Sequence, residues 1–136
     1  MKETFLIGRV IAGGYFIYSG VKHFVDLPAM SEFAAHKGIP MPTAAVVVAG
    51  VLLLIGGVSF LFGLVPKVGI VALTLFFVPV TLLMHSFWRE HGAARTMDLM
   101  NFTKNFALLG AVLMTWAVPE PWPLSVDTRL HIPRRV

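Results

Sequence analysis

The sequence contains no cysteine, and this absence excludes several kinds of chemistry. Thiol nucleophiles, CxxC redox relays, disulfide bonds, thiolate metal sites and iron–sulfur clusters all need that residue. Charge is also scarce, since only 13% of the 136 residues are charged, against about 25% in a typical soluble domain. The chain is long enough for one domain only. Because charge is so scarce, we expect its surface to face lipid.

A nucleic-acid partner is not expected, although the net charge is +4. The basic residues are dispersed between apolar runs, and they form no cluster or aromatic-interleaved stripe. We interpret them as anchors beside anionic lipid. No phosphate-binding, dinucleotide-binding or nucleophile-elbow motif is present.

Four long apolar runs make up more than half of the chain, at residues 5–24, 43–64, 68–87 and 102–118. About 20 helical residues cross a hydrocarbon core of roughly 30 Å. The runs are continuous rather than alternating, which excludes strands. Arg9 interrupts the first run, so we expect a retained span rather than a cleaved signal. The sequence predicts an all-α membrane protein, with four transmembrane helices in one antiparallel bundle.

The links between the runs have their own signals. Asp26 and Pro28 are typical of a helix start, and Lys37 with Gly38 of a helix stop, so a short interfacial helix is expected between runs one and two. Pro79 inside run three predicts a bend.

Four spans place both termini on one side of the membrane. The short turn that carries Lys67, together with a basic tail, favours a cytoplasmic position for that side. Residues 119–136 are polar and proline-rich, and we expect them to be irregular. The opposite side is called side B below.

Small residues predict where the helices touch, because they let helix backbones approach in lipid. Run four carries a row with four-residue spacing, formed by Thr103, Ala107, Ala111 and Thr115. Paired glycines mark further points of close approach at Gly13, Gly14, Gly56 and Gly57.

Polar residues near the ends of three runs should converge at side B and form a candidate ligand site. They are Ser19, Lys22, His85, Trp88, Asn101, Lys104 and Asn105. The alternative is that they are ordinary snorkelling and aromatic-belt residues. Two asparagines are poor lipid-facing residues, which favours a site.

Arg9 is a candidate intramembrane cation with no carboxylate in any of the four runs. Our first expectation is that it snorkels to lipid phosphate. The alternative is a buried position, with hydrogen bonds to backbone carbonyls or to an acidic ligand. His23 and His85 raise the question of haem, but no carboxylate or thiolate accompanies them, so haem or metal is not favoured.

Several segments together resemble the DoxX family of four-span bacterial inner-membrane proteins. The segments are Gly8-Arg9, Ser19-Gly20-x-Lys22, residues 33–42, Ala49-Gly50, Gly56-Gly57, His85-Ser86-Phe87-Trp88, and Asn101-Phe102-x-Lys104-Asn105 with residues 107–110. The family is named for a subunit of a thiosulfate:quinone oxidoreductase, and some relatives are linked to redox-stress complexes. The resemblance implies an inner-membrane location, with quinone as one candidate ligand.

Two positions depart from the family pattern. A glutamate often precedes the paired glycines of run two by three residues, and that position is Leu53 here. An aspartate usually follows the histidine of run three, and here it is Ser86. This sequence therefore lacks both of those carboxylates.

Three functions follow as hypotheses. The first is a membrane subunit or partner of a quinone- or thiosulfate-linked redox system, without independent catalysis. The second is a non-catalytic scaffold that docks partner proteins. The third is a carrier for a small anionic or lipid-like solute with Arg9 and Lys22 as contacts, and at this length it would need to be a homo-oligomer.

Overall fold

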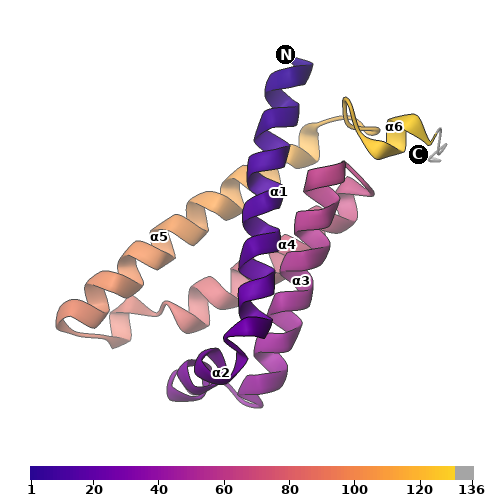
Figure 1. Ribbon diagram of the computed structural model, residues 1–136. Helices are drawn as coiled ribbons and strands as arrows, with labels where there is room; N and C mark the ends of the chain where they lie inside the picture. The colour runs from indigo at the N-terminus through magenta and orange to yellow at the C-terminus, as the bar shows by residue number, and fades with distance from the viewer. Residues whose placement is uncertain (131–136) are drawn as a thin grey trace.

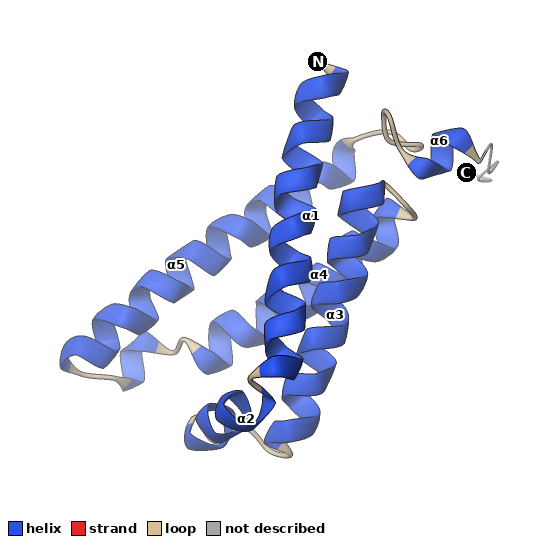
Figure 2. Ribbon diagram, in the orientation of Figure 1, coloured by secondary structure: helices blue, strands red, loops and turns tan. Residues whose placement is uncertain are grey.

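The computed structural model describes residues 1–130, and over that range the chain forms helices and no strand (Figure 2). The main elements are α1 (Lys2–Val25), α2 (Leu27–His36), α3 (Pro42–Phe62), α4 (Pro66–Pro79), α5 (Gly92–Met114) and α6 (Val126–Arg129). The prediction of an all-helical membrane fold with a short helix after the first span is confirmed.

Three segments are long and apolar enough to cross a membrane: Lys2–Val25, Pro42–Phe62 and Pro66–Arg89. They match the first three predicted runs closely. The fourth, α5, begins at Gly92 rather than at residue 102, because its polar first turns are also helical. Its 23 residues give a length of about 35 Å at 1.5 Å per residue. That α5 crosses the bilayer stays a prediction.

The helices run alternately up and down, and α3 contacts both α1 and α4 (Figure 1). α5 packs against α4, while its first half and the segment before it lie away from α1 and α3 (Figure 1). The N-terminus and α6 lie at the same end of the molecule (Figure 1). The opposite end, with α2, corresponds to side B.

α1 and α3 meet at Gly13 and Gly57. A Cβ added to Gly13 would lie 2.6 Å from the amide nitrogen of Leu61 and 2.8 Å from the carbonyl oxygen of Gly57. Both atoms belong to the backbone, so the helix axes could not stay in place. The predicted close approach is confirmed here. The row on run four differs, because Thr103, Ala107 and Ala111 are exposed.

Gly13→Ala is expected to destabilise the protein by about 1–3 kcal/mol, because the added methyl forces two backbones apart. Gly14→Ala is the matched control, since a Cβ there meets nothing within 4 Å. Alanine at that neighbouring position should be neutral or slightly stabilising, because it favours the helix. Thermal unfolding in detergent followed by circular dichroism measures both. Equal melting temperatures for the two variants would contradict the close approach.

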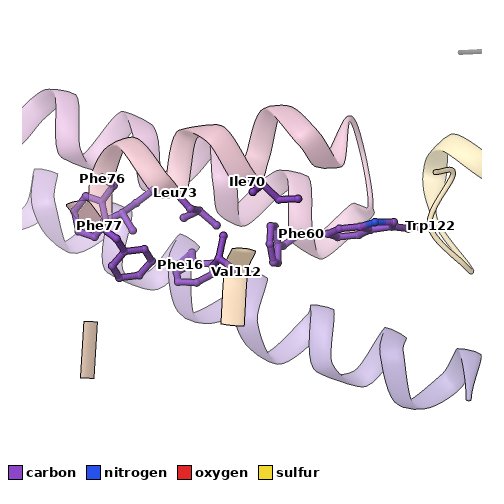
Figure 3. Close-up of a cluster of buried hydrophobic side chains, with 9 residues drawn as sticks. Phe16, Phe60, Ile70, Leu73, Phe76, Phe77, Val112 and Trp122 are labelled. Carbon is purple, nitrogen blue, oxygen red and sulfur yellow. The ribbon is translucent and has the colours of Figure 1, made fainter. Parts of the chain in front are cut away.

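The hydrophobic core runs along the bundle from Phe76 and Phe77 to Trp122 (Figure 3). Trp122 is fully buried and packs edge-on against Phe60, with ring centroids 5.2 Å apart, and against Phe5, at 5.3 Å. The segment 119–130 is irregular apart from α6, as expected, but it closes one end of the core. Residues 131–136 of the predicted tail lie outside the described residues.

The predicted helix start, helix stop and bend are largely confirmed. Asp26 is the N-cap of α2 and Lys37 its C-cap, and Gly38 follows with φ of +79°. Gly63 ends α3 with φ of +63°, a conformation that glycine adopts easily. After Pro79, where a bend was predicted, the α-helix gives way to the π-helix η1 (Val80–Met84).

Candidate ligand cavity

A cavity of about 600 Å³ lies at the side B end of the bundle. Its walls come from α1, α2 and α3 on one side and from α4, η1 and α5 on the other. Most of the lining is apolar. The chemically informative lining residues are Tyr15, Ser19, His23, His85, Lys104 and Asn105.

Local sequence explains how the polar wall is placed. Ser19 and His23 are one helical turn apart, so they share a face of α1. Pro79 has no amide hydrogen to donate, and the chain continues as the wider turn of η1 before it reaches His85. Such π-helical turns are frequent at functional sites. On α5, Asn105 is buried, whereas Lys104 is exposed and donates to the side-chain oxygen of Asn101 at 3.0 Å.

Four of the seven predicted site residues line this cavity: Ser19, His85, Lys104 and Asn105. The other three do not. Lys22 forms an exposed ion pair with Asp26, one turn later on the chain. Trp88 is about half exposed and packs against Phe102, with ring centroids 6.0 Å apart. Asn101 is absent from the cavity wall and accepts the hydrogen bond described above.

An ionic cluster, which the sequence did not predict, lies beside the polar wall. The Nζ atom of Lys37 is 2.7 Å from a carboxylate oxygen of Glu90 and 2.7 Å from one of Asp98. The other oxygen of Asp98 is 3.4 Å from Nδ1 of His85. The side chains of Lys37 and Asp98 are 8% and 7% exposed, and that of Glu90 is 29% exposed. Two negative charges therefore surround one buried cation.

Lys37 joins the two walls of the cavity. It follows α2 directly, whereas Glu90 and Asp98 lie at the corner between α4 and α5. Burial alone would lower the pKa of Lys37, but the hydrogen bonds to Asp98 and Glu90 outweigh it and raise the pKa above 10.5. The lysine is therefore charged at neutral pH. Because the pairs are mostly buried, they are screened less than surface pairs.

Asp98 was missed because the fourth run was started at residue 102. Asp98 lies three residues before Asn101 and seven before Asn105, so it continues the same helical face. Extending the helical face that carries Asn101 and Asn105 backward by one turn would have added Asp98 to the candidate site. No local signal pairs it with Lys37, which is 61 residues away in the chain.

Arg9 lies at the other end of α1 and is 3% exposed. Its Nη2 atom donates to the carbonyl oxygen of Leu124 at 3.0 Å. The expectation that Arg9 reaches lipid phosphate is wrong, and the alternative of a buried side chain bonded to a backbone carbonyl is what the structure shows. The physical reason is the segment 119–130, which folds over this end of the bundle.

Both departures from the family pattern are buried. Leu53 is 1% exposed, belongs to the hydrophobic core and also lines the cavity. Ser86 is 3% exposed and precedes the short helix η2 (Phe87–Arg89).

Comparisons with known proteins agree with this architecture. The chain matches the DoxX family model over residues 4–86, which is more than half of its length. It is also 26% identical over 124 residues to the inner membrane protein YphA of Escherichia coli (strain K12), covering 91% of this chain and 88% of that protein. No solved structure matches the chain. With its apolar helices and the matched family model, the chain belongs to the DoxX family of membrane proteins.

Proposed function

We propose that the protein binds a quinone-class molecule in the side B cavity. We further propose that it serves as a membrane subunit or partner of a redox system, without independent catalysis. The observation that carries the proposal is a cavity of about 600 Å³ with apolar walls and a polar end. Cavities of roughly 300–1,000 Å³ suit small organic ligands, which are fixed by a few polar groups.

The two parts of a quinone match the two parts of the cavity. The apolar wall of α3 and α4 suits an isoprenoid tail, while His85 and Asn105 can hydrogen bond to the oxygens of a ring. Such a ligand dissolves in the lipid phase that surrounds the helices. The lack of cysteine leaves the chain without its own thiol redox chemistry, so electrons would pass to a partner protein.

The carrier hypothesis loses support. Its two cationic contacts, Arg9 and Lys22, are 13 residues apart on one helix, which corresponds to about 20 Å. Arg9 is packed under the segment 119–130, and Lys22 is paired with Asp26. The scaffold hypothesis remains the second candidate, because the small-residue row of α5 is exposed and available to a partner helix.

The proposal is tested with decylubiquinone and purified protein in lipid nanodiscs. Equilibrium dialysis against empty nanodiscs corrects for partition into lipid. Ala49 lines the cavity, so Ala49→Phe should fill it and weaken binding at least tenfold. Ala107→Phe is the matched control, since Ala107 is exposed on α5 and should leave binding unchanged. Folded wild-type protein that binds no more decylubiquinone and no more decylubiquinol than empty nanodiscs would refute the proposal and favour the scaffold.

We also propose a bacterial inner-membrane location with both termini in the cytoplasm. The short turn carrying Lys67 supports the position of the termini. The inner-membrane location is supported by the similarity to the E. coli inner membrane protein YphA. Because the chain has no cysteine, Lys67→Cys can be labelled alone in intact cells. Labelling of this cysteine by a membrane-impermeant maleimide would place it outside the cytoplasm and would contradict the proposed orientation.

A further inference from the structure

Two histidines in the cavity have one ring nitrogen fixed by an oxygen that can only accept. Nδ1 of His23 is 2.8 Å from the carbonyl oxygen of Ser19. Nδ1 of His85 is 3.4 Å from a carboxylate oxygen of Asp98. A carbonyl or carboxylate oxygen has no proton to give, so Nδ1 is the donor in both rings.

This pairing determines what the other nitrogen can do. A neutral imidazole carries one N–H, so when Nδ1 holds it, Nε2 presents a lone pair. No residue of the described chain, 1–130, donates to either Nε2 atom. Lys37 supports the arrangement at His85, because its ammonium group contacts Asp98 at 2.7 Å and favours the charged carboxylate.

The remaining polar groups of the cavity do not offset these two acceptors. Lys104 also lines the cavity and is a donor, but its side chain is exposed and one of its three N–H groups already bonds to Asn101. The side chains of Tyr15, Ser19 and Asn105 make no hydrogen bond within the described chain, and each can either donate or accept. Among the lining residues that are not exposed, the groups whose hydrogen-bonding direction is fixed are therefore the two Nε2 acceptors. A ligand with ring hydroxyls satisfies them, whereas a carbonyl oxygen would face a lone pair.

We infer that the cavity selects the reduced, dihydroxy form of a quinone-class ligand over the oxidised form. His23 and His85 accept its hydroxyl hydrogens at Nε2. The inference rests on the proposed function, since it names the redox form that the same cavity holds. A ligand that covers these Nε2 atoms without donating to them leaves two acceptors unpaired, and that cost separates two otherwise similar ligands.

The test compares three ligands under anaerobic conditions in nanodiscs: decylubiquinol, decylubiquinone, and the dimethyl ether of decylubiquinol. The ether keeps the ring and tail but has no hydroxyl hydrogen. We expect the quinol to bind at least tenfold more tightly than either of the other two. His85→Leu and His23→Leu should remove most of this difference, and His85→Gln should restore part of it by returning an acceptor. His36→Leu is the control, because His36 is exposed and outside the cavity.

A second measurement does not depend on the folding of any variant. In wild-type protein labelled with ¹⁵N-histidine, the NMR signals of His23 and His85 should show Nδ1 protonated and Nε2 unprotonated. The opposite tautomer in both rings would overturn the inference.

The failures of the two proposals are distinguishable. Equal binding of quinol, quinone and ether would overturn the inference and leave the proposed function standing. No binding of any of the three by folded protein would remove the proposed function itself. Added haemin that gives a Soret band lost in both histidine-to-leucine variants would identify haem as the occupant and overturn the inference.

Discussion

Replacing Lys37 with methionine should lower the free energy of unfolding by about 3 kcal/mol, because it leaves Asp98 buried without its cation. The two side chains are 8% and 7% exposed and their charged atoms are 2.7 Å apart. The value lies at the low end of the range for broken buried pairs, since Glu90 is partly exposed and can be hydrated. Circular dichroism during heating in detergent gives the change in melting temperature, which should be about 10 °C.

Lys22→Met is the matched control for this prediction. Lys22 also forms an ion pair, with Asp26, but both side chains are well exposed, at 41% and 38%. Exposed pairs contribute little to stability because water and salt screen them, so this variant should melt close to the wild type. If the two methionine variants lose the same small amount, Lys37 does not hold the walls of the cavity together.

The sign of the pKa shift at Lys37 makes the prediction more specific. A lysine whose pKa is raised on folding stabilises the protein fully below its unfolded pKa, and this contribution is lost as pH rises through the folded value. The folded pKa lies above 10.5. The difference between wild type and Lys37→Met attributable to this lysine should thus persist from about pH 7 to pH 9.

Trp122→Ala is the second substitution expected to have a large effect, with a loss of about 3–5 kcal/mol. The side chain is fully buried, and it packs against Phe5 of α1 and Phe60 of α3. Its removal leaves a cavity between these two rings and detaches the segment 119–130 from the core. Arg9 would then lose the carbonyl of Leu124 that it contacts.

The matched control for this substitution is Trp116→Ala. Trp116 is 52% exposed, and its described ring contact is with Lys67, at 5.9 Å. An exposed contact of this kind contributes about 0.5–1 kcal/mol. Melting temperatures from circular dichroism compare the two without relying on tryptophan fluorescence. Similar losses for both variants would show that the segment 119–130 adds nothing to the core.

Most of the fold could be predicted from the sequence because lipid restricts the choice. A long apolar run has to be a helix, so the first three spans followed from length and hydropathy alone. The helix start at Asp26 and the helix stop at Lys37 and Gly38 are also local signals and could be predicted. The start of α5 could not be predicted in this way, because hydropathy marks where a helix can meet lipid and does not detect helical turns that are polar.

The candidate site was predicted in part, and the missing part is long-range. Ser19, His85 and Asn105 came from spacing on single helices, together with an antiparallel topology. The contact between Lys37 and Asp98 depends on how α2 lies against the corner between α4 and α5, which no local pattern encodes. The burial of Arg9 was predicted only as the alternative for the same reason, since its partner Leu124 is 115 residues away.

The most direct test of the proposed function is to find where a quinone sits. A photoreactive azido-quinone is irradiated with the protein in nanodiscs, and the labelled positions are identified by mass spectrometry. We expect labelling within residues 44–53 and 75–85, two segments that carry most of the cavity's lining residues, and its loss when excess decylubiquinone competes. Labelling that resists competition and falls on outward residues such as Ile11 and Met114, which are 69% and 76% exposed, would contradict it.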